Sequence, residues 1–252
     1  MTLAEITEAI INCERCPRLR EYCRTVASEK RAAYRDETYW GKPVPGFGDP
    51  NARLLVVGLA PAAHGANRTG RVFTGDGRGA SGEFLFAAMQ AAGFANQSSC
   101  DQAGDGLRLT DAYVLSAARC APPGNKPLPS EIRNCQVHLD RELDALADVR
   151  VLVALGRLAW DAVLVQLRRR GDPLKPRPEF AHGAVYRSSS GLYAIGAYHP
   201  SRQNTHTGRL TPPMLARVFH TARELIRPGH ISCNCHHLDR NLSNEGGNTH
   251  EF

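Results

Sequence analysis

RLLVVGL, residues 53–59, is a short apolar run that contains glycine near its end, and such a run is typical of a buried β-strand. Comparable runs recur down the chain, and stretches of helical character separate them. They lie within LTDAYVLSAARC (109–120), VRVLVALG (149–156) and LYAIGAY (192–198). Strands that alternate with helices indicate a parallel sheet covered on both faces. We therefore expect a three-layer α/β sandwich with a central four-stranded parallel sheet.

Helices are expected before, between and after these strands. TLAEITEAIIN, residues 2–12, has one apolar face and a capping box formed by Thr2 and Glu5. The other predicted helices span 81–93, 130–147 with Ser130 as the cap, 157–170 and 212–226, and the Gly/Pro-rich stretches 40–51 and 171–183 are read as loops. The chain shows no internal repeat, so residues 1–230 are expected to form one domain. Residues 231–252 are polar and aperiodic and are read as a mobile tail.

Composition limits the classes of protein that remain. The 252 residues include 31 Lys and Arg against 25 Asp and Glu, and this net charge of +6 weakly favours a polyanionic partner. On charge alone, a nucleic-acid-binding protein and an ordinary basic enzyme are about equally plausible. No apolar run approaches the roughly 18–20 residues of a membrane helix. The N-terminus carries acids and no basic n-region, so we expect an intracellular protein without a signal peptide.

Eight cysteines are many for an intracellular chain, where disulfides are rare. Cys13 and Cys16 form a C-x2-C pair, and Cys120 and Cys135 bracket the segment APPGNKPLPSEIRN. This pattern indicates a metal site before a disulfide. Spacing alone does not separate zinc from an iron–sulfur cluster. The remaining cysteines are Cys23, Cys100, Cys233 and Cys235, and the last two lie in a tail that would hold a metal poorly.

Three polar, Gly/Pro-containing segments follow predicted strands. They are GLAPAAHGANRTGRVFTGDGRG (58–79), RCAPPGNKP (119–127) and HPSRQNTHTGRLTPP (199–213). Each has an ordinary explanation when taken alone: the glycine run at 75–79 lies too far past its strand for a P-loop, and the histidines, arginines and Phe73 can serve structure or surface charge. Because ligands of open α/β sheets bind beyond the carboxyl ends of the strands, the convergence of all three predicts a site there.

These segments closely resemble the motifs of the uracil-DNA glycosylase superfamily, most closely those of its fifth, type B, family. The resemblance covers about residues 10–226. It implies a monofunctional DNA glycosylase that hydrolyses the N-glycosidic bond of uracil and related deaminated or damaged bases and leaves an abasic site. It also implies a double-stranded DNA substrate, with single-stranded DNA as a second option, and a monomer in the prokaryotic cytoplasm, associated with the nucleoid rather than a membrane.

The same resemblance assigns roles to individual residues. Asp76 would stabilise the sugar cation and hold the attacking water, Asn125 would orient that water, and His199 would donate to the departing base. Ala60, Pro61, Phe73 and Ser116 would bind the base, with Phe73 stacking on it; the DNA contacts would come from His64, Arg68, Ser201, Arg202, Gln203, Asn204 and Arg209. Cys13, Cys16, Cys120 and Cys135 would hold a structural [4Fe–4S] cluster, with zinc as the alternative.

Two departures from related families bear on chemistry. Apolar Leu59 and Ala60 stand where other glycosylase families place Asp, Asn or Glu, which is the fifth-family condition and shifts support of the water to Asn125 and Asp76. Ser116 stands where the fourth family has an Asn that reads uracil. A hydroxyl gives a less fixed match than an amide, so a broader base range is expected.

Two other functions compete with this interpretation. A non-catalytic iron–sulfur or zinc protein that binds nucleic acid would not need the combination of Asp76, Asn125 and His199. An electron-transfer protein would use the cluster for redox chemistry, but the chain carries no flavin or nicotinamide fingerprint.

Overall fold

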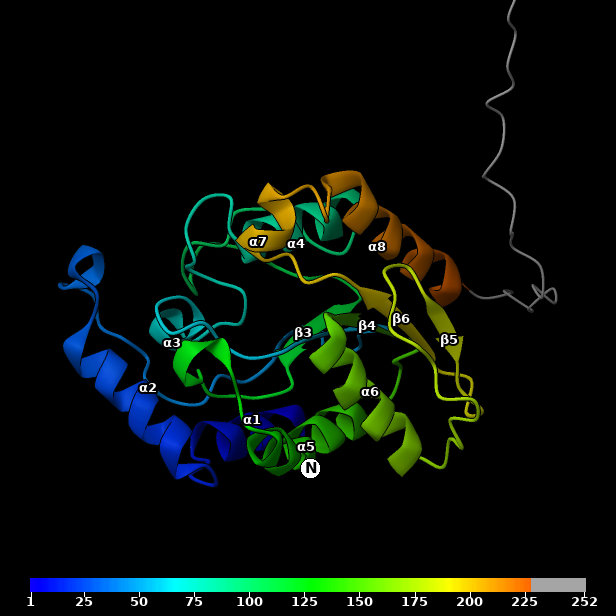
Figure 1. The fold of residues 1–252 in the computed structure, drawn as a ribbon, viewed down its shortest axis with the longest axis horizontal. Coiled ribbons are helices and arrows are strands. Elements are labelled where there is room, and N and C mark those ends of the chain that lie inside the picture. The colour runs from blue at the N-terminus through cyan, green and yellow to red at the C-terminus, as the bar shows by residue number, and fades with distance from the viewer. Residues whose placement is uncertain (228–252) are drawn as a thin grey trace, which may run out of the picture.

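The computed structural model describes residues 1–227, which are built around one mixed sheet of six strands (Figure 1). The strand order is β1-β3-β2-β4-β6-β5. In chain order the strands are β1 (Phe47–Gly48), β2 (Leu54–Gly58), β3 (Ala112–Ser116), β4 (Val151–Leu155), β5 (Val185–Arg187) and β6 (Tyr193–Ala197). The four predicted strands are the central ones and run parallel to one another. The expected four-stranded sheet is nevertheless wrong in extent, because β1 and β5 add antiparallel edges.

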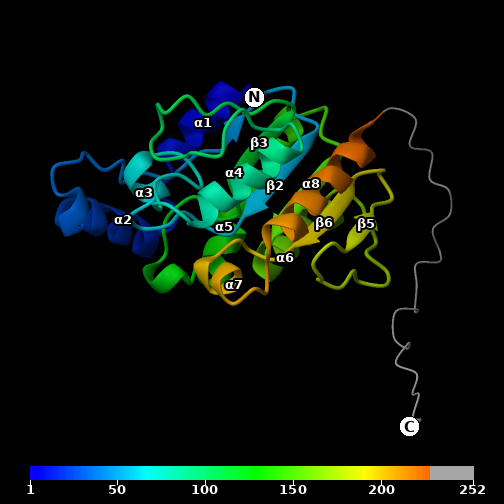
Figure 2. The ribbon, with the colours of Figure 1, turned by 90° about the horizontal axis from the view of Figure 1, so that it is seen from above.

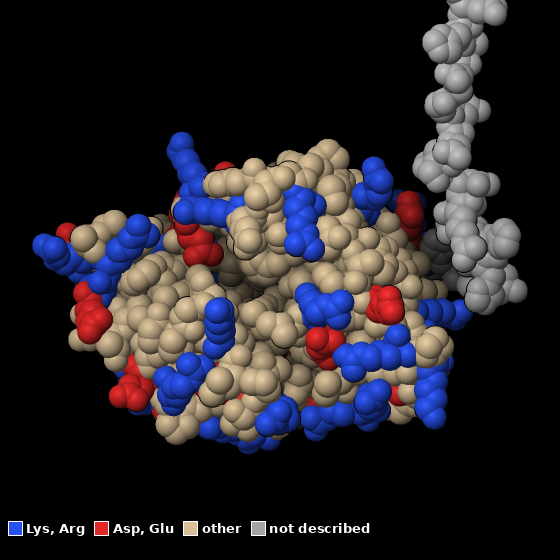
Figure 3. Space-filling view, viewed as in Figure 1, with Lys and Arg blue, Asp and Glu red and all other residues tan. Residues whose placement is uncertain are grey.

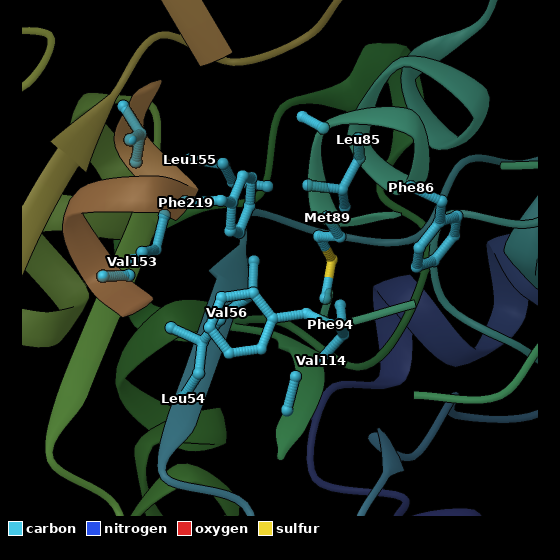
Figure 4. Packing of buried hydrophobic residues seen from close by; sticks show 14 of the residues in the cluster. Leu54, Val56, Leu85, Phe86, Met89, Phe94, Val114, Val153, Leu155 and Phe219 are labelled. Atoms are coloured by element: carbon cyan, nitrogen blue, oxygen red, sulfur yellow. The ribbon is translucent and has the colours of Figure 1, made fainter. Parts of the chain in front are cut away.

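Alternation of side chains along the central strands separates two apolar cores. Leu54 and Val56 of β2 point to one face, where they pack with α4 (Ser81–Ala91) and α8 (Pro212–Ile226). Figure 4 shows this packing, with Phe219 and Met89 meeting the sheet. The intervening Leu55 and Val57 point to the opposite face and pack with α5 (Pro129–Ala145) and α6 (Arg157–Arg169). The fold therefore has three layers, as expected, and Figure 2 shows helices on both sides of the strands.

All five predicted helices are present, with one error at a cap. Thr2 and Glu5 form the expected capping box of α1 (Leu3–Ile11). Ser130 does not cap α5: the helix starts one residue earlier, and the Glu131 carboxylate instead accepts a hydrogen bond of 2.7 Å from the backbone N–H of Leu128. A carboxylate in the first turn satisfies an otherwise free amide there, which explains why the start lies before the serine.

Several short elements were not predicted. They are α2 (Pro17–Glu29), α3 (Ala66–Thr69), α7 (Arg202–His206) and the 3-10 turns η1 (Ala32–Tyr34) and η2 (Pro123–Asn125). Of these, α2 and η1 form an arm that stands at one end of the molecule in Figure 1. The other three lie in the segments that follow β2, β3 and β6, at the carboxyl edge of the sheet.

Two expectations concern the limits of the domain. No helix within residues 1–227 is long and apolar enough to cross a bilayer. The predicted tail, residues 231–252, lies outside the described residues together with Cys233 and Cys235.

Candidate active site

The three polar segments meet in one cleft of about 790 Å³ at the carboxyl edge of the sheet. Figure 3 shows a hollow on this face, with Lys and Arg side chains around it. The predicted residues that line the cleft are His64, Phe73, Asp76, Ser116, Asn125, His199, Ser201, Arg202 and Gln203. The expected convergence is therefore present in the structure. Strand β3 pairs with one side of β2 and strand β4 with the other, so the strand order reverses at β2. The site lies beyond this topological switch point, where α/β sheets bind ligands.

Phe73 lies in the cleft with a strained backbone. Its φ of 54° falls in the left-handed region that bulky residues avoid. Its ring lies over Gly58, where an added Cβ would be 2.7 Å from Cζ, and this Cβ would also be 3.5 Å from the Ser116 hydroxyl. Because Gly58 has no side chain, the Phe73 ring and the buried Ser116 hydroxyl can both lie next to it. A pocket for a nucleobase requires such a pairing of an aromatic surface with a polar group.

Asp76 follows the glycine turn and is held against the loop after β2. A Cβ at Gly65 would overlap its Oδ1, so only glycine allows this placement. Burial raises the pKa of this carboxyl to about 6, against the opposing attraction of Arg202 and Arg68. Arg202 also donates a hydrogen bond of 3.2 Å to the Asp76 carbonyl oxygen. At neutral pH the carboxylate is mostly ionised and basic enough to take a proton.

His199 follows β6 and faces Phe73, with ring centroids 6.1 Å apart. Burial lowers the pKa of His199 to about 4. The ring is therefore neutral at pH 7 and offers one N–H donor. The side-chain amide of Asn204 donates 2.8 Å to the His199 carbonyl oxygen, which fixes the turn that presents the imidazole.

Asn125 ends the turn η2 on the opposite side of the cleft from α7. It has a left-handed φ of 57°, a conformation that Asn tolerates better than most residues. Its backbone N–H donates 3.1 Å to the carbonyl of Pro122, which closes the turn. The Asn125 side chain is exposed and lines the cleft, so it can contact a bound water.

Five predicted site residues do not line the cleft. They are Ala60, Pro61, Arg68, Asn204 and Arg209. Arg68 is the clearest correction, because it is only 7% exposed, pairs with Glu37 and donates to the carbonyls of His64 and Gly75. Its guanidinium also stacks 3.9 Å from the Tyr34 ring. Arg68 thus braces the loop before Asp76 with three of its five N–H groups, and little of the side chain reaches the surface.

The other four residues lie outside the lining of the cleft. Ala60 and Pro61 belong to the turn after β2, and Asn204 supports His199. Arg209 is exposed, with its guanidinium 4.8 Å from the Tyr198 ring, so it remains available at the rim.

The arm contributes residues that the sequence analysis missed. Tyr22, Arg31 and Tyr34 line the cleft opposite Arg202 and Gln203. Tyr34 of the arm stacks on Arg68, which lies in the loop after β2. Tyr39, which follows the arm in the chain, forms a 3.0 Å hydrogen bond with His64 of the same loop. Basic and aromatic residues on such a wall suit a nucleic acid strand.

The predicted ligand cysteines lie together at the base of this arm. Cys16 caps α2, Cys120 follows β3, and Cys135 lies in α5. The side-chain amide of Asn134 donates 3.5 Å to Cys16 Sγ, and negative charge on Cys13 or Cys16 would raise the pKa of Cys135. Cys23 packs in the same cluster as Cys16 and Cys120, and its thiol donates 3.6 Å to the Ala121 carbonyl oxygen. The four predicted ligands are all free thiols.

Their arrangement bears on which metal group they fit. Within residues 1–227, no three His, Cys, Asp or Glu side chains converge as ligands of a single metal ion. Four cysteine thiolates can hold either a zinc ion or an iron–sulfur cluster. The region is also positively charged: Arg20 and Arg119 are buried, and Arg119 lowers the pKa of the Cys135 thiol against the effect of burial. The chemistry of this donor set fits an iron–sulfur cluster.

Comparison with known proteins agrees with the geometry. The model of the family described as "Uracil DNA glycosylase superfamily" matches residues 45–223. Similar proteins include a type-5 uracil-DNA glycosylase of Mycobacterium tuberculosis, 47% identical over 89% of this chain and 82% of that protein. Another is a type-5 uracil-DNA glycosylase of Thermus thermophilus, 48% identical over 86% of this chain and 95% of that protein. A type-4 uracil-DNA glycosylase of Pyrobaculum aerophilum is 27% identical over 69% of this chain and 70% of that protein.

Proposed function

The chain belongs to the uracil-DNA glycosylase superfamily, and on that premise we propose that it is a DNA-repair enzyme that removes uracil from DNA by hydrolysis. The observation that carries the proposal is the placement of Phe73, Asp76, Asn125 and His199 in one cleft. A protein that only bound DNA would have no need of a strained aromatic plate beside a carboxylate with a raised pKa.

The reaction follows from the charges that these residues offer. A glycosylase takes the base out of the stack, and Phe73 provides the surface on which it stacks. As the bond from C1′ to the base nitrogen breaks, its electron pair leaves with the base, and the sugar becomes cationic. The His199 N–H stabilises the base anion, while the Asp76 carboxylate stabilises the cation.

Water completes the reaction on the opposite face of the sugar. Asn125 orients the water with its amide, which cannot accept the proton as a base. The water oxygen bonds to C1′, and Asp76, with its pKa of about 6, can take the proton. The products are a free base and an abasic site, and no covalent bond to the protein forms.

DNA is contacted by residues on two sides of the cleft. Ser201, Arg202 and Gln203 lie on one side, with Arg31 and Tyr34 of the arm on the other. Exposed Arg202 and Arg31 can contact phosphates, and both double-stranded and single-stranded DNA fit this arrangement. We expect a monomer that acts at the nucleoid in a prokaryotic cytoplasm.

The base range is proposed to extend beyond uracil. Ser116 is 2% exposed and is the residue available to read the base edge at the end of β3. A rotating hydroxyl accepts several hydrogen-bonding patterns. Hydroxymethyluracil, ethenocytosine and hypoxanthine are therefore expected substrates as well.

A [4Fe–4S] cluster on Cys13, Cys16, Cys120 and Cys135 is proposed as the resident cofactor. When bound, it would link four points of the chain through metal–thiolate bonds. Its role is structural, because it ties the N-terminal arm to the segment that carries Asn125. Cys23, at the edge of this site, is not assigned as a ligand.

One assay tests the function directly. Purified protein is incubated with a duplex that contains a single uracil, and alkali then cleaves any abasic site. We expect strand breaks at the uracil position only after treatment with alkali. Intact strands would exclude catalysis and favour a binding protein, and breaks without alkali would show a lyase rather than a monofunctional enzyme.

A further inference from the structure

Buried polar atoms without partners concentrate beside the cysteine site. Among residues 1–227, the buried side-chain nitrogens and oxygens that lack a partner are Asn67 Oδ1, Arg119 Nε and both ring nitrogens of His138. His138 is 2% exposed and Arg119 is 1% exposed, so bulk water does not compensate them. A buried polar group without a partner is costly, and in a native protein it calls for a missing partner.

Helix geometry directs His138 toward the cysteines. Glu131, Cys135, His138 and Glu142 follow one another at spacings of four and three residues, so they form one stripe of α5, and all four are buried. Side chains of a helix lean toward its N-terminus, which brings the imidazole over the turn that carries Cys135.

Arg119 closes the same space from the other side. Its backbone amide lies close enough to Cys135 to lower the pKa of that thiol, while its guanidinium pairs with Glu142. Arg119 therefore lies beside both Cys135 and Glu142, the members of the stripe that precede and follow His138. An imidazole carries at least one N–H donor in either protonation state, so the buried ring has a donor to offer.

We propose that His138 is a positioning residue that donates an N–H hydrogen bond to a sulfur of the iron–sulfur group held by the four cysteines, with Arg119 Nε as a second donor. This inference rests on the proposed cofactor. The sulfides and thiolates of a cluster are buried anionic acceptors, and such donors are what it needs. Hydrogen bonds to these sulfurs stabilise the reduced form and retain the metal, so His138 tunes the reduction potential and the stability of the cluster.

The test compares three variants of the full chain. His138→Leu removes the donor, His138→Gln keeps an N–H at similar reach, and Leu167→Ala opens a cavity in the same apolar core from α6, away from the stripe. The readouts are the midpoint potential from a redox titration and the rate at which a chelator bleaches the visible absorbance.

We expect His138→Leu to have a more negative potential and about 10–100-fold faster cluster loss, the usual range for outer partners of a metal site. His138→Gln should stay nearer the wild type, and Leu167→Ala should lower the melting temperature while leaving the potential unchanged. An unchanged potential in His138→Leu overturns the proposal. Wild-type protein without iron overturns the cofactor and this inference together, while uracil excision would still stand on its own assay.

Discussion

The base cleft and the cysteine site differ in whether their buried polar groups have partners within the protein. In the cleft, the reactive groups are held by protein alone: Gly58 admits the Phe73 ring, Gly65 admits the Asp76 carboxylate, and Asn204 fixes the turn of His199. At the cysteine site, Arg119 and His138 keep buried nitrogens unpartnered. Protein contacts hold the cleft residues, whereas the unpartnered nitrogens beside the cysteines would find their partners in the proposed cluster. Catalytic residues and cofactor should therefore respond to mutation in different ways.

The largest effect is expected from the cysteine ligands. Cys135→Ser should give colourless protein that has lost its iron and is poorly soluble, because the link between the arm and the segment of Asn125 is broken. Loss of the cluster is measured by absorbance at about 400 nm and by iron content. The wild type should contain about four iron atoms per chain. Cys23→Ser is the matched control and should keep its colour. Colourless wild-type protein with stoichiometric zinc would contradict the cluster.

His199→Ala should affect chemistry but leave the fold and cofactor intact. Loss of one preorganised donor to the base anion costs about 10²–10³ in the single-turnover rate. DNA affinity should hardly change, because the imidazole acts on the transition state. His206→Ala, an exposed histidine of α7, is the control and should behave like wild type. Equal losses of binding and rate in His199→Ala would argue for a DNA contact instead.

Asn125→Ala should have a smaller effect. The side chain positions water without exchanging its proton, and misplacement of a reactant costs up to about 10²-fold. We expect a tenfold to hundredfold lower single-turnover rate with an unchanged visible spectrum. Asn51→Ala, at an exposed turn far along the chain, controls for loss of an amide. A wild-type rate in Asn125→Ala would leave the water to Asp76 alone.

The smallest effect concerns salt. Arg202 is exposed at the rim, and loss of one phosphate contact should reduce the slope of log K against log salt by about one unit. Filter binding or anisotropy with a non-cleavable duplex measures it. Arg177→Ala, whose guanidinium pairs with Asp161, should leave the slope unchanged. If Arg202→Ala does so too, Arg202 touches no phosphate and serves only the Asp76 turn.

The core and the cleft follow from sequence because their signals are strong and local. Apolar runs predict β2, β3, β4 and β6 within a few residues, and parallel strands necessarily bring their following loops to one edge. The edge strands β1 and β5 are too short to leave a pattern. In α2, the apolar positions Leu19, Cys23 and Val26 have helical spacing, but the charged residues between them obscure it.

The failures at single residues have a tertiary origin. Arg68 looks like a phosphate contact in its loop, and only the arrival of Tyr34 and Glu37 from the arm shows that it is buried. The unpartnered ring nitrogens of His138 likewise become visible only once α5 is packed into the fold. Such assignments require the packing of distant segments, which no local pattern carries.

The central claim is that the Asp76 carboxylate acts in the chemistry of the cleft, and the single-turnover rate of uracil release as a function of pH tests it most directly. Burial sets the pKa of Asp76 at about 6, so the wild-type rate should fall about tenfold per pH unit below that value, as the carboxylate becomes protonated, and level off above it. Asp76→Asn should lose about 10²–10³ at neutral pH and lose the inflection. A near-wild-type rate in Asp76→Asn with intact circular dichroism would show that Asp76 only shapes the glycine turn, and would contradict the account.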